Sequence, residues 1–288
     1  MDFAAIILIQ VLYAIASLAL ISLGLAVIYG MMRVINFAHG EFLMLGGYAV
    51  VLPVQAGVNL WVAMLVIAPL TVGLFGVIVE RLIIRPLYGR MIDTVLATWG
   101  LSLFVIGFAT TVIGYYQRGA TPPFGSIRIG AYQEGLYTFF VIGITIVIMA
   151  AVYLFLRHTR FGLIALGTMQ NAKMAAALGV NTSRVYMATF GLGAALSGLA
   201  GAILAPIAGV VPTQGITYIA KAFITVIGGG ATVLAGTGSA SALFGAVSQL
   251  VTFVSTSILG EVALLVAAIV LLRLLPEGIT GRFFRRGL

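Results

Sequence analysis

The chain has 288 residues, of which 62% are hydrophobic and only 8% are charged, and it contains no cysteine. Soluble domains carry about 25% charged residues, so this composition excludes a soluble protein and favours an integral membrane protein. The lack of cysteine excludes disulfides and thiolate chemistry. The net charge of +8 does not require a nucleic-acid partner, because most basic residues gather in a few short segments between apolar runs.

Apolar runs of about 20 residues with polar ends predict membrane-spanning helices, because the hydrocarbon core of a bilayer is about 30 Å thick. The strand alternation typical of a barrel is not seen, so the predicted fold class is an all-α, polytopic helical bundle. We expect a single transmembrane domain over 1–288 with eight or nine membrane segments. The predicted segments cover about 3–29, 42–54, 60–79, 95–116, 137–156, 185–208, 218–227, 240–259 and 262–272.

Two short Gly-rich stretches interrupt this pattern, HGEFLMLGGY after the first segment and GGGATVLAGTG after the sixth. Transporters built from inverted repeats place broken helices at corresponding positions of their two halves. We therefore expect two halves of inverted-topology type with Gly-broken short helices, either of which could be re-entrant. Small residues four apart in the sixth segment also predict close helix packing there.

The basic residues predict the orientation of the chain. Cytoplasmic loops carry an excess of Lys and Arg, and 12 of the 15 basic residues fall in segments that we place on that side. The N-terminus has no basic residue before its apolar run, which favours a retained first span that enters from outside. The basic tail predicts a cytoplasmic C-terminus. The 12 residues are Arg33, Arg81, Arg85, Arg90, Arg157, Arg160, Lys173, Arg184, Arg273, Arg282, Arg285 and Arg286.

The segment 157–184 is a polar interruption between two apolar spans, with four basic residues and no acid. Its composition predicts a short cytoplasmic helix over 168–178, between Gly167 and Gly179. A basic amphipathic helix can lie on anionic lipid. Its surface of small alanines suits a protein groove better, and a helix held in this place is one that a separate motor subunit could push.

Four polar residues lie where the chain is otherwise apolar: Asn36, His39, Glu41 and Lys221. Ionisable groups in a membrane tend to line a polar interior or to pair with each other. Glu41 and His39 suit either a transport pathway or the capping of a helix start. Lys221 suits either snorkelling to the membrane interface or an ion pair with Glu41 between the two halves.

The sequence contains no motif that predicts catalysis. The phosphate-binding pattern G-x-x-x-x-G-K-[ST], the H-E-x-x-H metal motif and the G-x-S-x-G elbow are all missing. No series of intramembrane carboxylates suggests a proton relay. We therefore expect no catalytic residue, no metal and no cofactor in this chain.

Two stretches carry a resemblance to a known family. GLAVIYGMMRVINFAHGEFLMLGGYAV and RFGLIALGTMQNAKMAAALGVNTSRVYMATFGLGAALSGLAGAI resemble the branched-chain amino acid ABC transporter permeases, of the smaller type in the high-affinity system. The resemblance implies a subunit of an importer in a bacterial inner membrane. It implies three kinds of protein partner besides the lipid membrane: a homologous second permease, two cytoplasmic ATPase subunits that bind the ATP, and a periplasmic or extracellular substrate-binding protein.

The resemblance also implies roles for particular residues. The helix that docks on an ATPase would comprise residues 170–179, with Gln170, Asn171, Lys173, Ala176, Leu178 and Gly179 as the contacts. The translocation pathway or gate would be lined by Asn36, His39, Glu41, Lys221, Gly228, Gly229 and Gly230.

Two departures from the family pattern concern the substrate. The second Gly-rich motif reads GGGATVLAGTGSASALFG, and Asn171 stands where an acidic residue is frequent. Similar permeases move urea or short-chain amides, which is the first alternative. The others are an ion-coupled secondary transporter, which would work without ATPase subunits, and a membrane scaffold that transports nothing.

Overall fold

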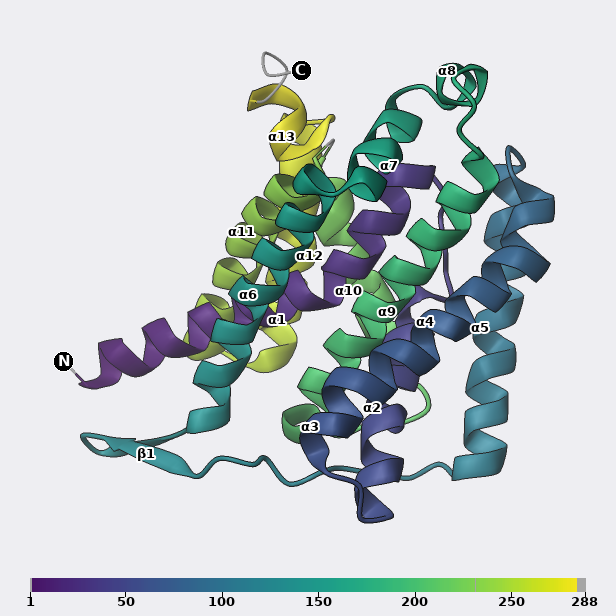
Figure 1. Ribbon diagram of the computed structural model, residues 1–288. Helices are drawn as coiled ribbons and strands as arrows, with labels where there is room; N and C mark the ends of the chain where they lie inside the picture. Colours follow the sequence, from purple (N-terminus) through teal and green to yellow (C-terminus); the bar gives the residue numbers. More distant parts are fainter. Residues whose placement is uncertain (1, 231, 284–288) are drawn as a thin grey trace. The chain divides into compact units, whose positions relative to one another are not determined.

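The computed structural model describes residues 2–230 and 232–283, and these form an all-α membrane protein (Figure 1). Seven helical stretches of the described chain are long and apolar enough to span a bilayer, which confirms the predicted fold class. Arg285 and Arg286 of the predicted basic tail lie outside the described residues. The seven stretches are Phe3–Met32, Leu60–Leu87, Met91–Ile113, Leu136–His158, Thr182–Ala208, Val233–Val254 and Ser257–Gly281.

A helix occupies each of the nine predicted segments, although two segments are divided. The segment 60–79 comprises α3, η1 and α4, and the segment 240–259 is broken between α11 and α12. The first half contains α1 (Asp2–Met32), α2 (His39–Gln55), α3 (Leu60–Val62), the π-helical turn η1 (Ala63–Ile67), α4 (Ala68–Val79), the π-helical turn η2 (Glu80–Ile84), the 3-10 turn η3 (Arg85–Leu87) and α5 (Met91–Ile113). The second half contains α6 (Leu136–His158), α7 (Arg160–Gln170), α8 (Ala172–Ala177), α9 (Thr182–Ala208), α10 (Gln214–Gly229), α11 (Val233–Val254), α12 (Ser257–Leu274) and α13 (Gly278–Phe283).

The loop between α5 and α6 contains a small antiparallel hairpin of strands β1 (Ser126–Ile129) and β2 (Tyr132–Gly135). Ser126 pairs with Gly135, and Ile129 pairs with Tyr132. Gly130, at φ +60°, occupies the turn, where the left-handed conformation favours glycine. The hairpin therefore closes through the turn residue that its geometry requires.

The chain divides into two compact units. Unit 2 contains residues 23–121 and 151–220, and unit 1 contains residues 1–22, 122–150 and 221–288. Three helices contribute to both units, because the divisions fall within α1, within α6 and within α10. The single domain over 1–288 stays a prediction.

Unit 2 is organised around α9, which packs on α2 and α4 through glycine. A Cβ atom added at Gly201 would overlap the carbonyl oxygen of Leu43, and one added at Gly46 would overlap that of Gly198. Backbones in such contact leave no room for a side chain, so the predicted close packing of this span is confirmed. Phe42 fills the space beside the contact, with its ring 6.0 Å from that of Phe190.

The Gly201 contact provides a test of this packing. We expect Gly201→Ala to lower the free energy of unfolding by about 1–3 kcal/mol, because the methyl group meets a backbone carbonyl that cannot rotate away. Thermal unfolding of the purified protein in detergent measures the change. Gly107→Ala in α5 is the matched control, because a Cβ there meets nothing within 4 Å. Equal stability of the two variants would contradict the packing described here.

In unit 1, α11 and α12 form a hairpin whose turn corrects one sequence prediction. The helix break falls at Ser255 and Thr256, and not near residue 260, so the ninth segment is a full helix of 18 residues. The Thr256 hydroxyl accepts a hydrogen bond from Leu259 N at 3.3 Å, and Ser255 Oγ donates to Val251 O at 2.6 Å. These short polar side chains end one helix and start the next, because they bond the free backbone groups of helix ends.

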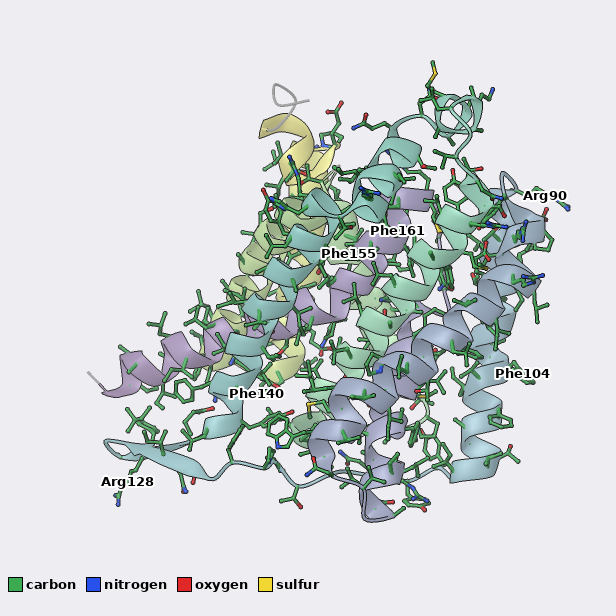
Figure 2. The ribbon with its side chains drawn as sticks, viewed as in Figure 1. Arg90, Phe104, Arg128, Phe140, Phe155 and Phe161 are labelled. Carbon is green, nitrogen blue, oxygen red and sulfur yellow. The ribbon has the colours of Figure 1, made fainter. Side chains whose placement is uncertain are left out.

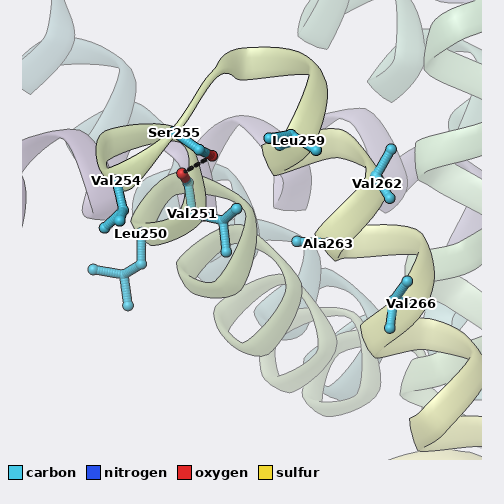
Figure 3. A pocket seen from close by; sticks show the side chains of 8 residues that line it. All are labelled: Leu250, Val251, Val254, Ser255, Leu259, Val262, Ala263 and Val266. Atoms are coloured by element: carbon cyan, nitrogen blue, oxygen red, sulfur yellow. Dashed lines mark hydrogen bonds between the residues drawn. The ribbon is translucent and has the colours of Figure 1, made fainter.

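An open pocket of about 600 Å³ lies at this turn (Figure 3). Its lining is apolar apart from Ser255, and Val254 is 90% exposed. Such a surface suits contact with lipid chains and has no charged group to hold a polar substrate. The lining residues are Leu250, Val251, Val254, Ser255, Leu259, Val262, Ala263 and Val266.

Candidate functional site

The connection between α1 and α2 leads the chain to a buried helix start within unit 2. It begins at Arg33, whose φ of +54° is left-handed, and it is held by two hydrogen bonds. Phe37 N donates to Thr98 Oγ1 at 3.1 Å, and Ala38 N donates to Asn36 Oδ1 at 3.0 Å. Asn36 and His39 are both fully buried. Helix α2 therefore begins inside the protein, which is typical of the broken helices of transporters.

The connection between α9 and α10 repeats the same pattern. His39 N and Glu41 N donate to the carbonyl oxygens three residues earlier, at 3.2 and 3.1 Å. Gln214 N and Ile216 N do the same, at 3.1 and 3.2 Å. The two short helices, of 17 and 16 residues, thus start with the same turn, and each has glycine as its second residue.

This repeat corrects the match that the sequence suggested between the two Gly-rich stretches. The counterpart of HGEFLMLGGY begins at Gln214, and the stretch with Gly228, Gly229 and Gly230 lies at the other end of α10. There Gly229 packs on Gly236, and Thr280 Oγ1 donates to Gly229 O at 2.6 Å. Gly230, at φ +85°, follows the helix end in a left-handed conformation. The three glycines therefore end α10 within unit 1.

The first turns of α2 and α10 meet in unit 2, at what we call the Gly40–Gly215 junction. A Cβ atom at Gly40 would overlap the carbonyl oxygen of Gly215, and one at Gly215 would overlap the carboxylate of Glu41. Each helix N-terminus carries a partial positive charge of about +0.5. The junction thus brings two positive helix ends to one buried carboxylate.

Glu41 is held at this junction by a single hydrogen bond. Its exposed fraction is 1%, and its Oε1 accepts from Ser102 Oγ at 2.8 Å. Its Oε2 is buried without a hydrogen-bond partner. His39 lies nearby on the same turn, with Nδ1 3.4 Å from Ser197 Oγ. The structure therefore brings together three of the predicted pathway residues, namely Asn36, His39 and Glu41.

The hydroxyl partners of this cluster were missed by sequence reasoning. Thr94, Thr98 and Ser102 lie four residues apart on α5, and all three are buried. Residues four apart share one face of a helix, so this spacing in an apolar span was a signal for a polar stripe turned inward. Ser197 of α9 is also fully buried, and it donates to Gly193 O at 2.8 Å.

Lys221 of α10 lies in unit 1, and its partner is not the predicted one. Its Nζ is 2.7 Å from Glu261 Oε1 of α12, while Glu41 is bonded to Ser102. The hypothesis of a Glu41–Lys221 pair is therefore wrong. The carboxylate of Glu261 is 56% exposed, so the ion pair contributes only about 0–1 kcal/mol to stability.

Charge reversal tests this pair. We expect Lys221→Glu to lower the free energy of unfolding by about 1 kcal/mol, because it places two carboxylates side by side, and we expect Glu261→Lys in the same chain to restore it. Thermal unfolding of both single variants and the double variant measures the coupling. Arg128→Glu on the exposed hairpin is the control and should change little. Simple additivity of the two reversals would argue against the pair.

The cytoplasmic segment predicted from the sequence forms two helices instead of one. Helix α7 ends at Gln170, and α8 starts after Asn171, whose Oδ1 accepts a hydrogen bond from Met174 N at 2.9 Å. The predicted helix over 168–178 is therefore wrong in its bounds. Asparagine as an N-cap competes with a continuous helix, which is why the break falls there.

Helix α8 projects beyond the ends of α7 and α9 (Figure 1). Leu178 is 78% exposed, and Gly179 has a φ of +86°. Below it, α7 is tied to the end of α6, with the Phe155 and Phe161 rings 5.9 Å apart (Figure 2). All six predicted coupling residues are exposed, which leaves them accessible to a partner: Gln170, Asn171, Lys173, Ala176, Leu178 and Gly179.

The described residues contain no group of three or more His, Cys, Asp or Glu side chains placed to hold a metal ion. What they do contain is a polytopic helical bundle with two short helices that start at a buried carboxylate, and this arrangement is typical of membrane transporters. The chain belongs to the family described as "Branched-chain amino acid transport system / permease component", whose model matches residues 7–275.

Named relatives are similar over nearly the whole chain. The high-affinity branched-chain amino acid transport system permease protein LivH of Escherichia coli (strain K12) is 28% identical over 280 residues, which covers 92% of this chain and 91% of LivH. The corresponding protein BraD of Pseudomonas aeruginosa is 28% identical, with the same coverage. A probable LivH of Methanocaldococcus jannaschii is 27% identical, over 92% of this chain and 88% of its own length. No solved structure matches the chain significantly.

Proposed function

We propose that this permease carries branched-chain amino acids, namely leucine, isoleucine and valine or related apolar amino acids, into the cell. The observation that carries the proposal is the family match over 7–275, together with relatives whose names state this transport system. The chain itself is not an enzyme under this proposal and holds no cofactor. ATP is bound and hydrolysed by two separate cytoplasmic subunits.

The exposed cytoplasmic segment supports the proposed coupling to those subunits. Closure of the ATPases would push α8, and α8 is joined to α9 by only four residues, 178–181. Helix α9 packs backbone to backbone on α2, so a displacement of α9 would reach the Gly40–Gly215 junction. Alternating access would then arise from parting and closing of the short helices around a fixed centre.

The remaining partners and the orientation belong to the same proposal. A homologous second permease would complete the pathway, and an external binding protein would deliver the amino acid. The permease is a multi-pass protein of the inner membrane, with the N-terminus proposed outside and the C-terminus in the cytoplasm. The basic residues of α7 and α8, and Arg273 in the last turn of α12, support that orientation.

ATP-dependent uptake into proteoliposomes tests the proposal. The permease is reconstituted with its second permease, its ATPases and its binding protein, and labelled leucine and labelled urea are supplied in parallel. We expect leucine uptake that requires ATP and an active ATPase. Urea uptake without leucine uptake would show that the protein belongs to an ATP-driven importer whose substrate is urea. Uptake by this chain alone, driven by an ion gradient, would overturn the importer and favour a secondary transporter.

A further inference from the structure

Glu41 is buried in unit 2, and its Oε2 is an acceptor without a hydrogen-bond donor. We propose that Glu41 Oε2 binds the α-ammonium group of the transported amino acid when the Gly40–Gly215 junction opens. The inference rests on the proposed function, because it assumes that the substrate is an amino acid. It assigns a specific contact to a residue that the sequence places only near the pathway.

Glu41 Oε2 lacks a hydrogen-bond donor. A buried carboxylate oxygen without a hydrogen bond is costly, and such groups are rare unless a ligand or a second state supplies the partner. Glu41 is 99% buried, and Ser102 serves only its Oε1. Ion pairs of the described residues join Arg90 with Asp93 and Lys221 with Glu261, and neither of these two pairs involves Glu41.

Glu41 is surrounded by the partial positive charge of two helix N-termini. It lies in the first turn of α2, and it touches Gly215 in the first turn of α10. Both helix N-termini favour an anion, which offsets part of the cost of burying a charged carboxylate there. An ionised carboxylate with a free oxygen attracts a cationic donor. An ammonium group provides up to three N–H donors on one positive charge.

A whole amino acid matches a carboxylate that lies beside two helix N-termini. A helix N-terminus also attracts a carboxylate through its partial positive charge. A zwitterion could therefore place its ammonium group on Glu41 and its carboxylate on the first turn of α10 or α2. Neither urea nor a simple amide carries such a pair of charges. The contact therefore selects for amino acids over the neutral alternatives.

The Gly40–Gly215 junction determines when this site can form. With Gly40 against the carbonyl of Gly215, no space remains between the two helices at this point. The structure is thus a closed state, and the binding site forms only when α10 and α2 part. Parting exposes Glu41 Oε2 and the two helix N-termini together, because they already share this contact.

Equilibrium binding of three related probes tests the contact. The assembled complex of permeases and ATPases, without the binding protein, is loaded with ADP or with a non-hydrolysable ATP analogue. The probes are labelled leucine, isopentylamine, which lacks the carboxylate, and 4-methylpentanoate, which lacks the ammonium group. We expect Glu41→Gln to weaken binding of leucine and of isopentylamine about tenfold or more, and to leave 4-methylpentanoate unchanged or tighter.

Two further variants distinguish a ligand role from a structural one. Glu41→Asp keeps the charge and should keep most of the leucine binding, whereas Glu261→Gln removes a carboxylate outside the junction and should change none of the three probes. If Glu41→Gln binds leucine as the wild type does, or if all three probes are lost together, the inference is wrong. If Glu41→Asp binds leucine as weakly as Glu41→Gln does, the negative charge at this position does not bind the ammonium group.

The failure of this inference can be told from the failure of the proposed function. ATP-dependent leucine uptake with no binding of leucine or isopentylamine in either nucleotide state would contradict the proposed Glu41 contact. It would leave the proposed function intact. Absence of ATP-dependent leucine uptake by the complete importer would remove the proposed function, whatever the probes show.

Discussion

Gly40→Val is expected to abolish ATP-driven uptake while the importer still assembles. The valine Cβ would overlap the carbonyl oxygen of Gly215, and a backbone carbonyl cannot rotate aside as a side chain can. Overpacking costs about 1–3 kcal/mol, and a rigid neighbour places this substitution at the upper end. A penalty of about 3 kcal/mol shifts any equilibrium that needs the closed junction by a factor of ~100. Initial rates of leucine uptake in proteoliposomes measure the loss.

Gly107→Val is the matched control, because it introduces the same side chain into a helix where a Cβ meets nothing within 4 Å. It should leave uptake within about twofold of the wild type, since only helix propensity changes. Retention of normal uptake by Gly40→Val would show that the junction does not need to close. Loss of assembly in both variants would point instead to general intolerance of valine in these helices.

The second large effect is expected at Gly179, where α8 is joined to α9. Its φ of +86° is left-handed, a conformation that costs an L-residue about 1–2 kcal/mol and a β-branched residue more. Gly179→Val would change the path of the chain at the proposed contact with the ATPase. We expect at least a tenfold loss of uptake, with ATP hydrolysis no longer stimulated by the loaded binding protein. Parallel assays of uptake and ATPase activity separate coupling from assembly.

Gly167→Val serves as its control. Gly167 lies within α7, and a Cβ there also meets nothing within 4 Å, but the position has no left-handed φ. The two variants therefore add the same side chain to the same segment and differ in backbone strain. If both couple normally, the conformation at Gly179 has no part in transmission. If both fail equally, the cause is the added bulk on the docking surface.

Apolar patterning predicted the helices well. About 20 apolar residues in a row span a bilayer, and a helix satisfies the hydrogen bonds of their backbone groups there. The ends were predicted less well. The breaks at Asn171 and at Ser255–Thr256 depend on single side chains that cap a helix. A prediction made from the lengths of apolar runs does not take such side chains into account. Thr256 and its serine neighbours are residues that favour helix caps, so their position in the sequence could have been used to predict the turn.

The site was predicted only in part, for a physical reason. Asn36, His39 and Glu41 are unusual in an apolar chain. Polar groups in a membrane protein tend to face the protein interior, and all three are buried. Their partners depend on how distant helices pack. Nothing local to Gly215 indicates that it touches Glu41, and nothing local to Lys221 indicates Glu261. Only the buried hydroxyls four residues apart on α5 carried a periodic signal of their own.

The contact of α2 with α9 has a consequence for solution conditions. Gly46 on Gly198 and Gly201 on Leu43 join backbone to backbone, so these two contacts contain no ionisable group and freeze no side-chain torsion. Ionic strength has nothing to screen at these two contacts, and acidity has nothing to titrate there. The two backbones should therefore keep one spacing at these positions from mild acid to mild base and from low to high salt. Any response of transport to pH or salt then originates outside these two contacts.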